Sequence, residues 1–159
     1  MAWTFTPTAQ DLQYCISAKL GTGTVAAGGN LNDNDIGKPL KLTAAGTYAL
    51  CADGDNIDGF LVAVDPETVD GYAFGTVQIG GRVYAQLEGA STFGYAVEAG
   101  GSAAARTAEA SGYGQVSSHA VIAIGSPTAT QYKTYIEAKK WRIISGAVTD
   151  DAIVLLEKQ

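Results

Sequence analysis

Hydrophobic and polar residues alternate over short stretches along most of the chain. After Gly21, glycine-containing turns separate these stretches every eight to twelve residues. Alternation with a period of two is typical of strands that bury one face, and turns at this spacing are typical of small sandwiches and barrels. The segments 38–43 and 47–51 flank a turn at 44–46 and are predicted to form a hairpin. The pattern therefore predicts an all-β fold, a small β-barrel or β-tulip/sandwich of short antiparallel strands.

Two further stretches predict strands of a different kind. Residues 60–64 form an uninterrupted apolar run, which favours a strand buried on both faces. Residues 76–79 and 82–88 flank Gly80-Gly81, a pair that readily adopts positive φ angles, and this predicts a second hairpin with a two-residue turn. In that hairpin, alternate residues would point inward (Val83, Ala85 and Leu87) and the others outward (Arg82, Tyr84, Gln86 and Glu88).

The rest of the chain is predicted to contain three more strands and two loops. Residues 114–125 alternate as a half-buried strand, and 140–144 and 152–157 are predicted to close the fold as strands on either side of a turn. The small residues of 99–105 have too little bulk for a core and predict a loop. Residues 126–138 begin with Ser-Pro, which could open a helix, but their threonines and tyrosines favour extended chain, so we expect a loop with at most one helical turn.

The first twenty residues differ from the remainder of the chain, because they contain no glycine and place aromatic and aliphatic side chains among polar ones. They are predicted to form an extended arm that reaches a neighbour or an edge strand that packs on its own domain. We therefore expect two parts: an N-terminal arm or edge strand at 1–20 and a single β-rich domain at 21–159, with a loop or insertion near 126–139.

The net charge of the chain and its distribution indicate which classes of partner to expect. The formal net charge is −6, and the stretch from Asn30 to Asp70 carries eight acids against two lysines, so the remainder of the chain is balanced. An acidic surface without a basic stripe repels phosphate, so no nucleic-acid partner is expected. No stretch approaches the ~18 apolar residues of a membrane span, and no signal peptide is recognisable, so we expect a soluble protein made in the cytoplasm. One basic cluster is expected to be a solvated face or a contact to an acidic protein: Lys133, Lys139, Lys140 and Arg142.

Candidate catalytic groups are few. His119 is the sole histidine, and neighbours in a strand point to opposite faces, so Ser118 cannot face it. Ser117 could face it, but no third group is indicated that would orient the imidazole. A zinc site lacks ligands, since the two cysteines, Cys15 and Cys51, are far apart in the sequence. Buried or half-buried free thiols are expected for both, with a single disulfide as the alternative.

Candidate cofactor and metal sites also fail at particular positions. The acidic stretch 53–59 invites a calcium-loop interpretation, but such a loop would need other residues in place of Ile57, Asp58 and Val64. Turns stabilised by Asp and Asn side chains explain this stretch better. Residues 21–26 have alanine where a dinucleotide fingerprint has its third glycine. We therefore predict no catalytic residue, no metal, no cofactor and no enzymatic activity.

Several of these segments resemble the capsid decoration, or cement, proteins of tailed phages. Members of that family share an extended "G-x-P-x-K-L" strand, a turn, a hydrophobic strand, an acidic turn, "G-F/V-L" and "V-x-x-x-G-x-V". The matching segments are Gly37-Lys38-Pro39-Leu40-Lys41-Leu42-Thr43-Ala44-Ala45-Gly46-Thr47, Leu50, Asp58-Gly59-Phe60-Leu61 and Val77-Gln78-Ile79-Gly80-Gly81-Arg82-Val83. The ends of some members are similar to residues 141–146 and 153–157.

This resemblance implies a structural virion protein on the outer surface of a bacteriophage capsid. It implies homo-oligomers, trimers or else dimers, that bridge neighbouring subunits of the major capsid protein and stabilise the head. Apolar and aromatic groups would then make the contacts: Trp3, Phe5 and Tyr14 toward the shell or a neighbour, and Tyr84 or Trp141 between protomers. The acidic turns of residues 30–70 would face solvent. The alternative is a β-rich binding module of a phage head fibre or tail that recognises a receptor or glycan.

Overall fold

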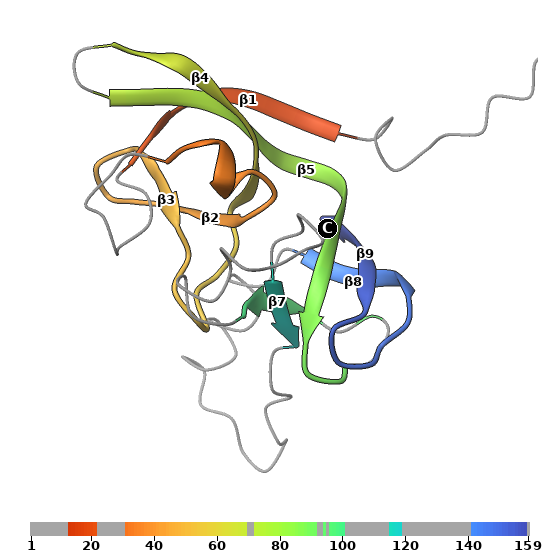
Figure 1. Cartoon of the computed structure of the whole chain (residues 1–159). Helices are drawn as coiled ribbons and strands as arrows, with labels where there is room; N and C mark the ends of the chain where they lie inside the picture. Colours follow the sequence, from red (N-terminus) through yellow and green to blue (C-terminus); the bar gives the residue numbers. More distant parts are fainter. Residues whose placement is uncertain are drawn as a thin grey trace, which may run out of the picture.

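The computed structural model describes residues 13–21, 31–69, 72–91, 94, 96–100, 115–118 and 141–158. The described part of the chain is built from strands, with a single turn of 3-10 helix (Figure 1). In chain order the elements are β1 (Gln13–Leu20), η2 (Asp33–Asp35), β2 (Pro39–Leu42), β3 (Tyr48–Leu50), β4 (Gly59–Val69), β5 (Tyr72–Glu88), β6 (Val97–Ala99), β7 (Gln115–Ser118), β8 (Trp141–Gly146) and β9 (Ile153–Lys158). The prediction of an all-β fold is confirmed. Among these residues, no helix has the length and apolar character needed to cross a membrane.

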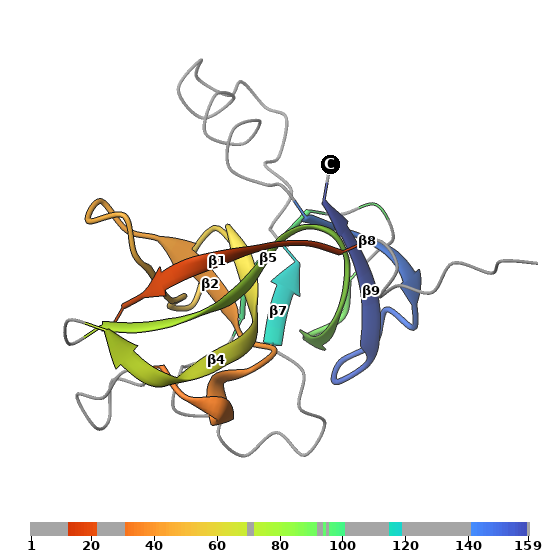
Figure 2. The same ribbon diagram turned by 90° about the horizontal axis from the view of Figure 1, so that it is seen from above.

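Five strands close into a ring that we call the first barrel. The antiparallel pairs β1–β5, β5–β4, β4–β2 and β2–β3 make most of the ring. A parallel contact between Leu20 of β1 and Tyr48 of β3 closes it. In Figure 2, β2 and β4 lie on the left side, away from β8 and β9, while β1 and β5 extend from this group to the right. Its buried cluster consists of Ala18, Leu20, Leu31, Leu40, Tyr48, Leu61, Ala73 and Val77.

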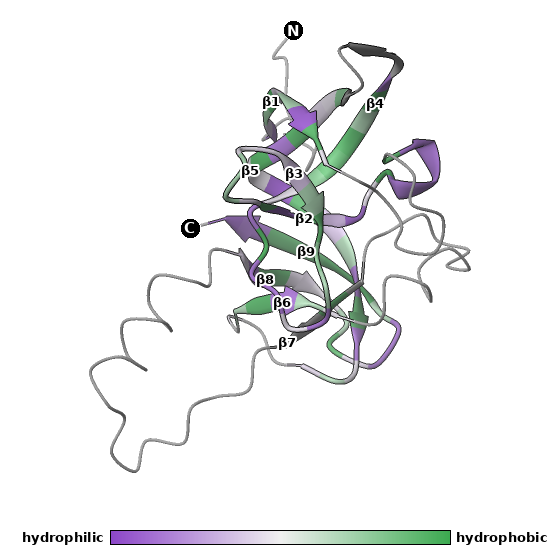
Figure 3. Ribbon diagram, turned by 90° about the vertical axis from the view of Figure 1, so that its left-hand side faces the viewer, coloured by the Kyte–Doolittle hydropathy of each residue, from purple (hydrophilic) through white to green (hydrophobic). Residues whose placement is uncertain are grey.

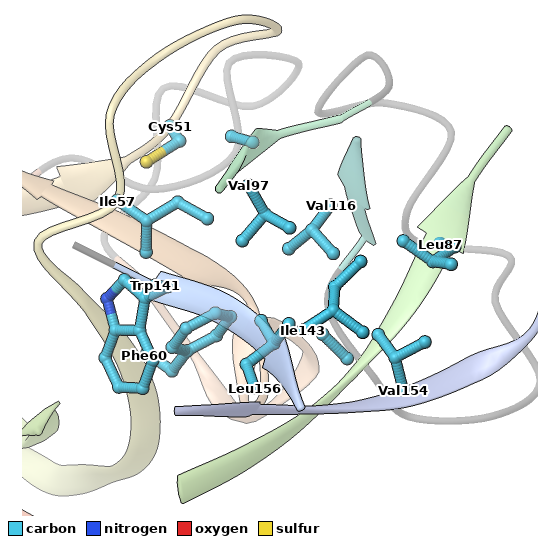
Figure 4. Packing of buried hydrophobic residues seen from close by; sticks show 12 residues of the cluster. Cys51, Ile57, Phe60, Leu87, Val97, Val116, Trp141, Ile143, Val154 and Leu156 are labelled. Carbon is cyan, nitrogen blue, oxygen red and sulfur yellow. The ribbon is translucent and has the colours of Figure 1, made fainter. Parts of the chain in front are cut away.

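A second ring, the second barrel, shares β5 with the first. The C-terminal half of β5 pairs antiparallel with β9 and parallel with β7, while β9 pairs with β8 and β7 with β6. An isolated bridge between Ala96 and Arg142 joins the start of β6 to β8 and closes the ring. The cluster that fills this barrel and the junction with the first is shown in Figure 4. It consists of Cys51, Ile57, Phe60, Ala85, Leu87, Val97, Ala99, Val116, Trp141, Ile143, Val154 and Leu156.

The predicted hairpin at Gly80-Gly81 is wrong, because both segments belong to one continuous strand of 17 residues. Gly81 does adopt a positive φ of 79°, but there the strand bends from the first barrel into the second (Figure 1). The side-chain amide of Gln78 holds the bend, since its Nε2 donates to the carbonyls of Gly80 (3.0 Å) and Arg82 (2.7 Å). A Gly-Gly pair permits a reversal without requiring one, and each half of β5 pairs with other strands instead.

The other predicted hairpins are confirmed. β2 pairs antiparallel with β3, and β8 with β9, at the predicted positions. The strand predicted at 60–64 is confirmed, and its first two residues are buried on opposite faces, with Phe60 in the cluster of the second barrel and Leu61 in that of the first. Residues 62–64 are only half-buried. A Cβ at Gly59 would lie 2.6 Å from Cγ1 of Val77, so β4 approaches β5 this closely only because position 59 is glycine.

In the second half of β5, the predicted inward positions are confirmed. Ala85 and Leu87 are fully buried, and Val83 packs against the same cluster. Of the residues predicted to face outward, Gln86 is in fact buried, and its Nε2 lies 3.4 Å from Oδ1 of Asp151.

The N-terminal segment follows the edge-strand alternative over its described part. Residues 13–20 form β1, which pairs with β5 in the same sheet as the rest of the first barrel. Residues 1–12 lie outside the described residues, as do 101–114 and 119–140, which include the predicted insertion near 126–139. Of the strand predicted at 114–125, residues 115–118 form β7.

Candidate functional site

The first acidic turn, residues 31–38, is organised around a buried ion pair. Asp35 and Lys38 are almost completely buried, and Lys38 Nζ donates to Asp35 Oδ1 at 2.8 Å. The other oxygen of Asp35 accepts a hydrogen bond from the backbone N–H of Asn32 at 3.0 Å, and the Asn32 side chain accepts one from the N–H of Asn34 at 2.9 Å. The expectation that the acids of residues 30–70 face solvent is therefore wrong for Asp35, because the ammonium of Lys38 and a backbone donor replace water.

The second acidic turn, residues 53–59, is held to β2 by hydrogen bonds to its carboxylates. Asp55 Oδ2 accepts hydrogen bonds from Lys41 Nζ at 2.5 Å and from the N–H of Ala52 at 2.6 Å. Asp58 Oδ2 accepts one from the N–H of Leu42 at 2.8 Å. The hydrogen bond to Asp55 raises the pKa of Lys41 above its usual value, against a smaller opposing effect of burial. The carboxylates of the calcium-like stretch thus hold the turn in place, as expected of Asp-rich turns.

No group of three or more His, Cys, Asp or Glu side chains that could hold a metal ion is present among the described residues. Ser117 lies in β7, where its backbone pairs with Glu88 and Glu98, whereas His119 lies outside the described residues. Whether Ser117 faces His119 therefore lies outside the described residues, and the absence of a catalytic pair stays a prediction. Neither cysteine forms a disulfide. Cys51 is buried, as predicted, whereas Cys15 is exposed, so the prediction of a buried or half-buried thiol is wrong for Cys15.

Trp141, predicted as a contact between protomers, is fully buried within its own chain. Its indole meets the ring of Phe60 edge to face, with centroids 5.1 Å apart and ring planes at 90° (Figure 4). The ammonium of Lys158 lies 5.7 Å from the centroid of Trp141 and donates to the carbonyls of Asp58 and Ile79. The prediction is corrected, because the side chain presents no surface to a neighbour and instead joins the two barrels.

Tyr14 and Tyr84, the other described candidates for contact residues, are on the surface, with 69% and 45% of their area exposed. Tyr14 lies over Gly80, with its side chain 3.3 Å from the position that a Cβ there would occupy. Tyr84 pairs with Leu155 on the second barrel. Tyr14, on β1 opposite Gly80 of β5, and Tyr84, on β5 itself, therefore lie on either side of the bend at Gly81, and neither is grouped with Trp141. Trp3 and Phe5 lie outside the described residues.

Sequence analysis missed several large apolar side chains that are at least one third exposed: Ile16, Ile36, Leu42 and Ile144. Ile16 is the most informative of these, because it follows Tyr14 by two positions in a strand whose residues 13–17 are all exposed. The sequence shows only that the stretch from Gln13 to Ser17 is uncharged, which does not by itself reveal that Ile16 is exposed. Figure 3 shows apolar and polar residues mixed along β1 at the edge of the first barrel.

Of the basic cluster, only Arg142 belongs to the described residues, and its guanidinium donates to the carbonyl of Gly94 at 3.1 Å. This contact fixes the segment before β6 against β8, next to the bridge that closes the second barrel. Arg142 thus has a structural role. For the other three basic residues, a solvated face or a contact to an acidic protein stays a prediction.

Comparison of the chain with family models, curated proteins and solved structures found no match.

Proposed function

We propose that the chain is a non-catalytic structural protein of a tailed-phage virion, a decoration protein that binds the outer surface of the capsid. In this role, homo-oligomers, which the resemblance to the decoration proteins implies to be trimers or else dimers, bridge neighbouring subunits of the major capsid protein. The bridges hold the shell together against the pressure of packaged DNA.

The observation that carries the proposal is how the segments of the resemblance lie in the fold. Residues 37–50 form the β2–β3 hairpin, and residues 58–61 begin β4 beside it. Residues 77–83 are the part of β5 that leaves the first barrel and enters the second. The segments therefore pair with one another in space and contain the turn between β2 and β3 and the bend of β5. Matching segments that pair with one another support the proposal better than matches scattered over the fold would.

The charged side chains of the described residues stabilise the fold, and this supports a scaffold role. Three ion pairs between described residues, Asp35–Lys38, Lys41–Asp55 and Arg82–Glu157, each join neighbouring strands or fix a turn. The side chains of the acidic turns mainly accept backbone N–H groups of the same chain. Such groups stabilise the fold. The exposed apolar side chains, Tyr14, Ile16 and Tyr84 among them, supply the kind of surface that protein contacts use.

A decoration protein needs only weak individual contacts. Each copy that binds the assembled shell and not its separated subunits favours the shell by mass action. Many copies acting on one particle add these small contributions, and an oligomer that binds several subunits gains further from effective concentration.

Quantitative mass spectrometry of purified virions tests the proposal. The chain is expected at hundreds of copies per particle, in a constant ratio to the major capsid protein. Virions that lack it should release DNA at a lower temperature, and adding the purified protein should restore the wild-type release temperature. A few copies per particle, or unchanged heat release without the protein, would contradict the proposal.

The same virions and purified protein distinguish the decoration role from the alternative, a receptor- or glycan-binding module of a head fibre or tail. That function predicts a few copies per particle and binding of the purified protein to particular glycans on an array. Hundreds of copies with no glycan binding would leave only the decoration protein.

A further inference from the structure

We propose that two copies of this chain pair through the outer edge of β1, antiparallel, about a two-fold axis at Cys15. The contact would form one continuous sheet from the first barrels of the two copies. It is a property of the protein by itself and goes beyond the proposed function, so it is tested on purified protein without a capsid.

The outer edge of β1 is unpaired over most of its length in the described part of the chain. Along its inner edge β1 pairs with β5 from Gln13 to Leu20. Its outer edge meets β3 only at Leu20, opposite Tyr48, where the barrel closes. In Figures 1 and 2 the N-terminal half of β1 extends beyond β2 and β3. Residues 13–18 therefore present backbone N–H and C=O groups of the kind that pair with another strand.

β1 lacks the features with which proteins commonly protect such an edge. Residues 13–17 contain no charge and no proline, and all five are exposed. The register shift between Tyr14 and Cys15 skips Ile79, so the extra residue of the bulge lies in β5 and β1 itself stays regular. Edge strands are usually protected by lysines, prolines, bulges or a covering segment. An exposed, uncharged and regular edge is suited to pairing.

The sequence of this edge is complementary to itself. With Cys15 opposite Cys15 of a second copy, Tyr14 lies opposite Ile16 of that copy, and Ile16 lies opposite its Tyr14. Each is a pair of an aromatic and a β-branched residue, a favourable combination across two strands. Gln13 and Ser17 also face one another, so no charged residue stands opposite another between positions 13 and 17.

Charge favours a second copy at this edge over a second copy elsewhere. The chain carries a net charge of −6, so two copies repel one another over most orientations. The stretch from Gln13 to Ser17 has no charge, and 69% of the Tyr14 surface and 36% of the Ile16 surface are available for burial. The β1 edge thus combines apolar area, unpaired backbone groups and an absence of like charges.

Cross-linking at Cys15 tests the pairing directly. In a Cys51→Ala background, a short bifunctional maleimide or mild oxidation should convert the protein to a covalent dimer through Cys15. The matched control places the thiol in an exposed turn with Cys15→Ser and Thr149→Cys. If this control cross-links as efficiently, or if Cys15 reacts with a monofunctional maleimide without forming dimers, the proposal is wrong.

A lysine at position 16 provides the second test. Ile16→Lys places two positive charges near the two-fold axis and should lower the yield of Cys15 dimers at least tenfold and abolish the corresponding association in sedimentation velocity. Leu42→Lys, which changes a side chain with 52% exposure away from β1, should leave both unchanged. Circular dichroism shows whether each variant folds. If Ile16→Lys does not fold, Tyr14→Lys replaces it, because Tyr14 is the most exposed apolar residue of the strand.

Dimers that persist in the folded lysine variants would overturn the inference, since pairing of these edges cannot accommodate the charges. These outcomes are distinguishable from those for the proposed function. Protein that pairs through Cys15 but is scarce in virions would contradict the decoration role alone. Protein that is abundant in virions but does not pair would contradict this inference alone.

Discussion

The ring of Phe60 and the indole of Trp141 meet edge to face, 5.1 Å between centroids, at the junction of the two barrels. Phe60 comes from β4 of the first barrel and Trp141 from β8 of the second, and both are buried. The two barrels share β5, and this contact and the adjacent ammonium of Lys158 help to hold the second barrel against the first.

Trp141→Ala should lower the free energy of unfolding by about 3–5 kcal/mol, because it removes a fully buried aromatic side chain and leaves a cavity between the barrels. Urea denaturation followed by circular dichroism measures this difference. Ile144→Ala is the control on the same strand, where the side chain is 36% exposed, and a change of less than about 1 kcal/mol is expected. A similarly small change in unfolding free energy for Trp141→Ala would contradict the burial of this side chain between the barrels.

Lys38→Met should destabilise the protein by about 3–5 kcal/mol, since it leaves the buried carboxylate of Asp35 without its cation. Lys41→Met removes the cation of the half-exposed pair with Asp55 and should cost no more than about 1 kcal/mol. Chemical denaturation of the two variants side by side tests the difference in burial. Equal effects would show that Asp35 and Lys38 are not buried as described.

The Lys41–Asp55 pair also predicts a dependence on pH. The pKa of Lys41 is raised in the folded protein by the hydrogen bond to Asp55, so folding favours the protonated amine. The resulting stabilisation is fully present below the unfolded lysine pKa of about 10.4 and is lost as the pH rises through the higher folded value. The difference in unfolding free energy between wild type and Lys41→Met should therefore be larger at about pH 8 than at about pH 11.5. A difference that grows with pH would have the wrong sign.

Gly81→Val should destabilise the protein by about 1–3 kcal/mol, because φ at this position is +79° and a β-branched residue is strained there. Gly81→Asn should cost less, since asparagine tolerates this region better. Thermal unfolding of the two variants gives the comparison. Equal melting temperatures would indicate that β5 does not bend at Gly81 in this way.

The two thiols should differ in reactivity. Cys15 is exposed and should react at once with a thiol reagent in the native protein, whereas Cys51 is buried and should react only after unfolding. Titration with and without denaturant should give two and one accessible thiols, respectively. Two fast thiols in the native state would place Cys51 outside the core.

Much of the fold could be predicted from local patterns. The alternation of Val83, Ala85 and Leu87 identified the inward face of β5, and turn residues identified the hairpins at both ends of the fold. The buried state of Trp141 also had a signal, because Ile143 follows it by two positions and is buried on the same face. That signal concerns the core, whereas the interpretation as an interface rested on the resemblance alone.

The candidate site was less predictable. Tyr14 and Tyr84 are exposed as expected, but exposure of Ile16 depends on where β3 leaves β1, which no local pattern encodes. The burial of Asp35 likewise depends on Lys38 reaching it within a tight turn that packs near β4.

The sequence by itself determined which stretches are strands, because period two and turn-forming residues are local properties. Only the tertiary structure decided which strands pair. Gly80-Gly81 is compatible with a reversal or with a bent strand, and β1 and β9, which lie far away in the sequence, supply the partners that favour the bend. The same long-range pairing leaves the start of β1 at an open edge, since β3 reaches it only at Leu20.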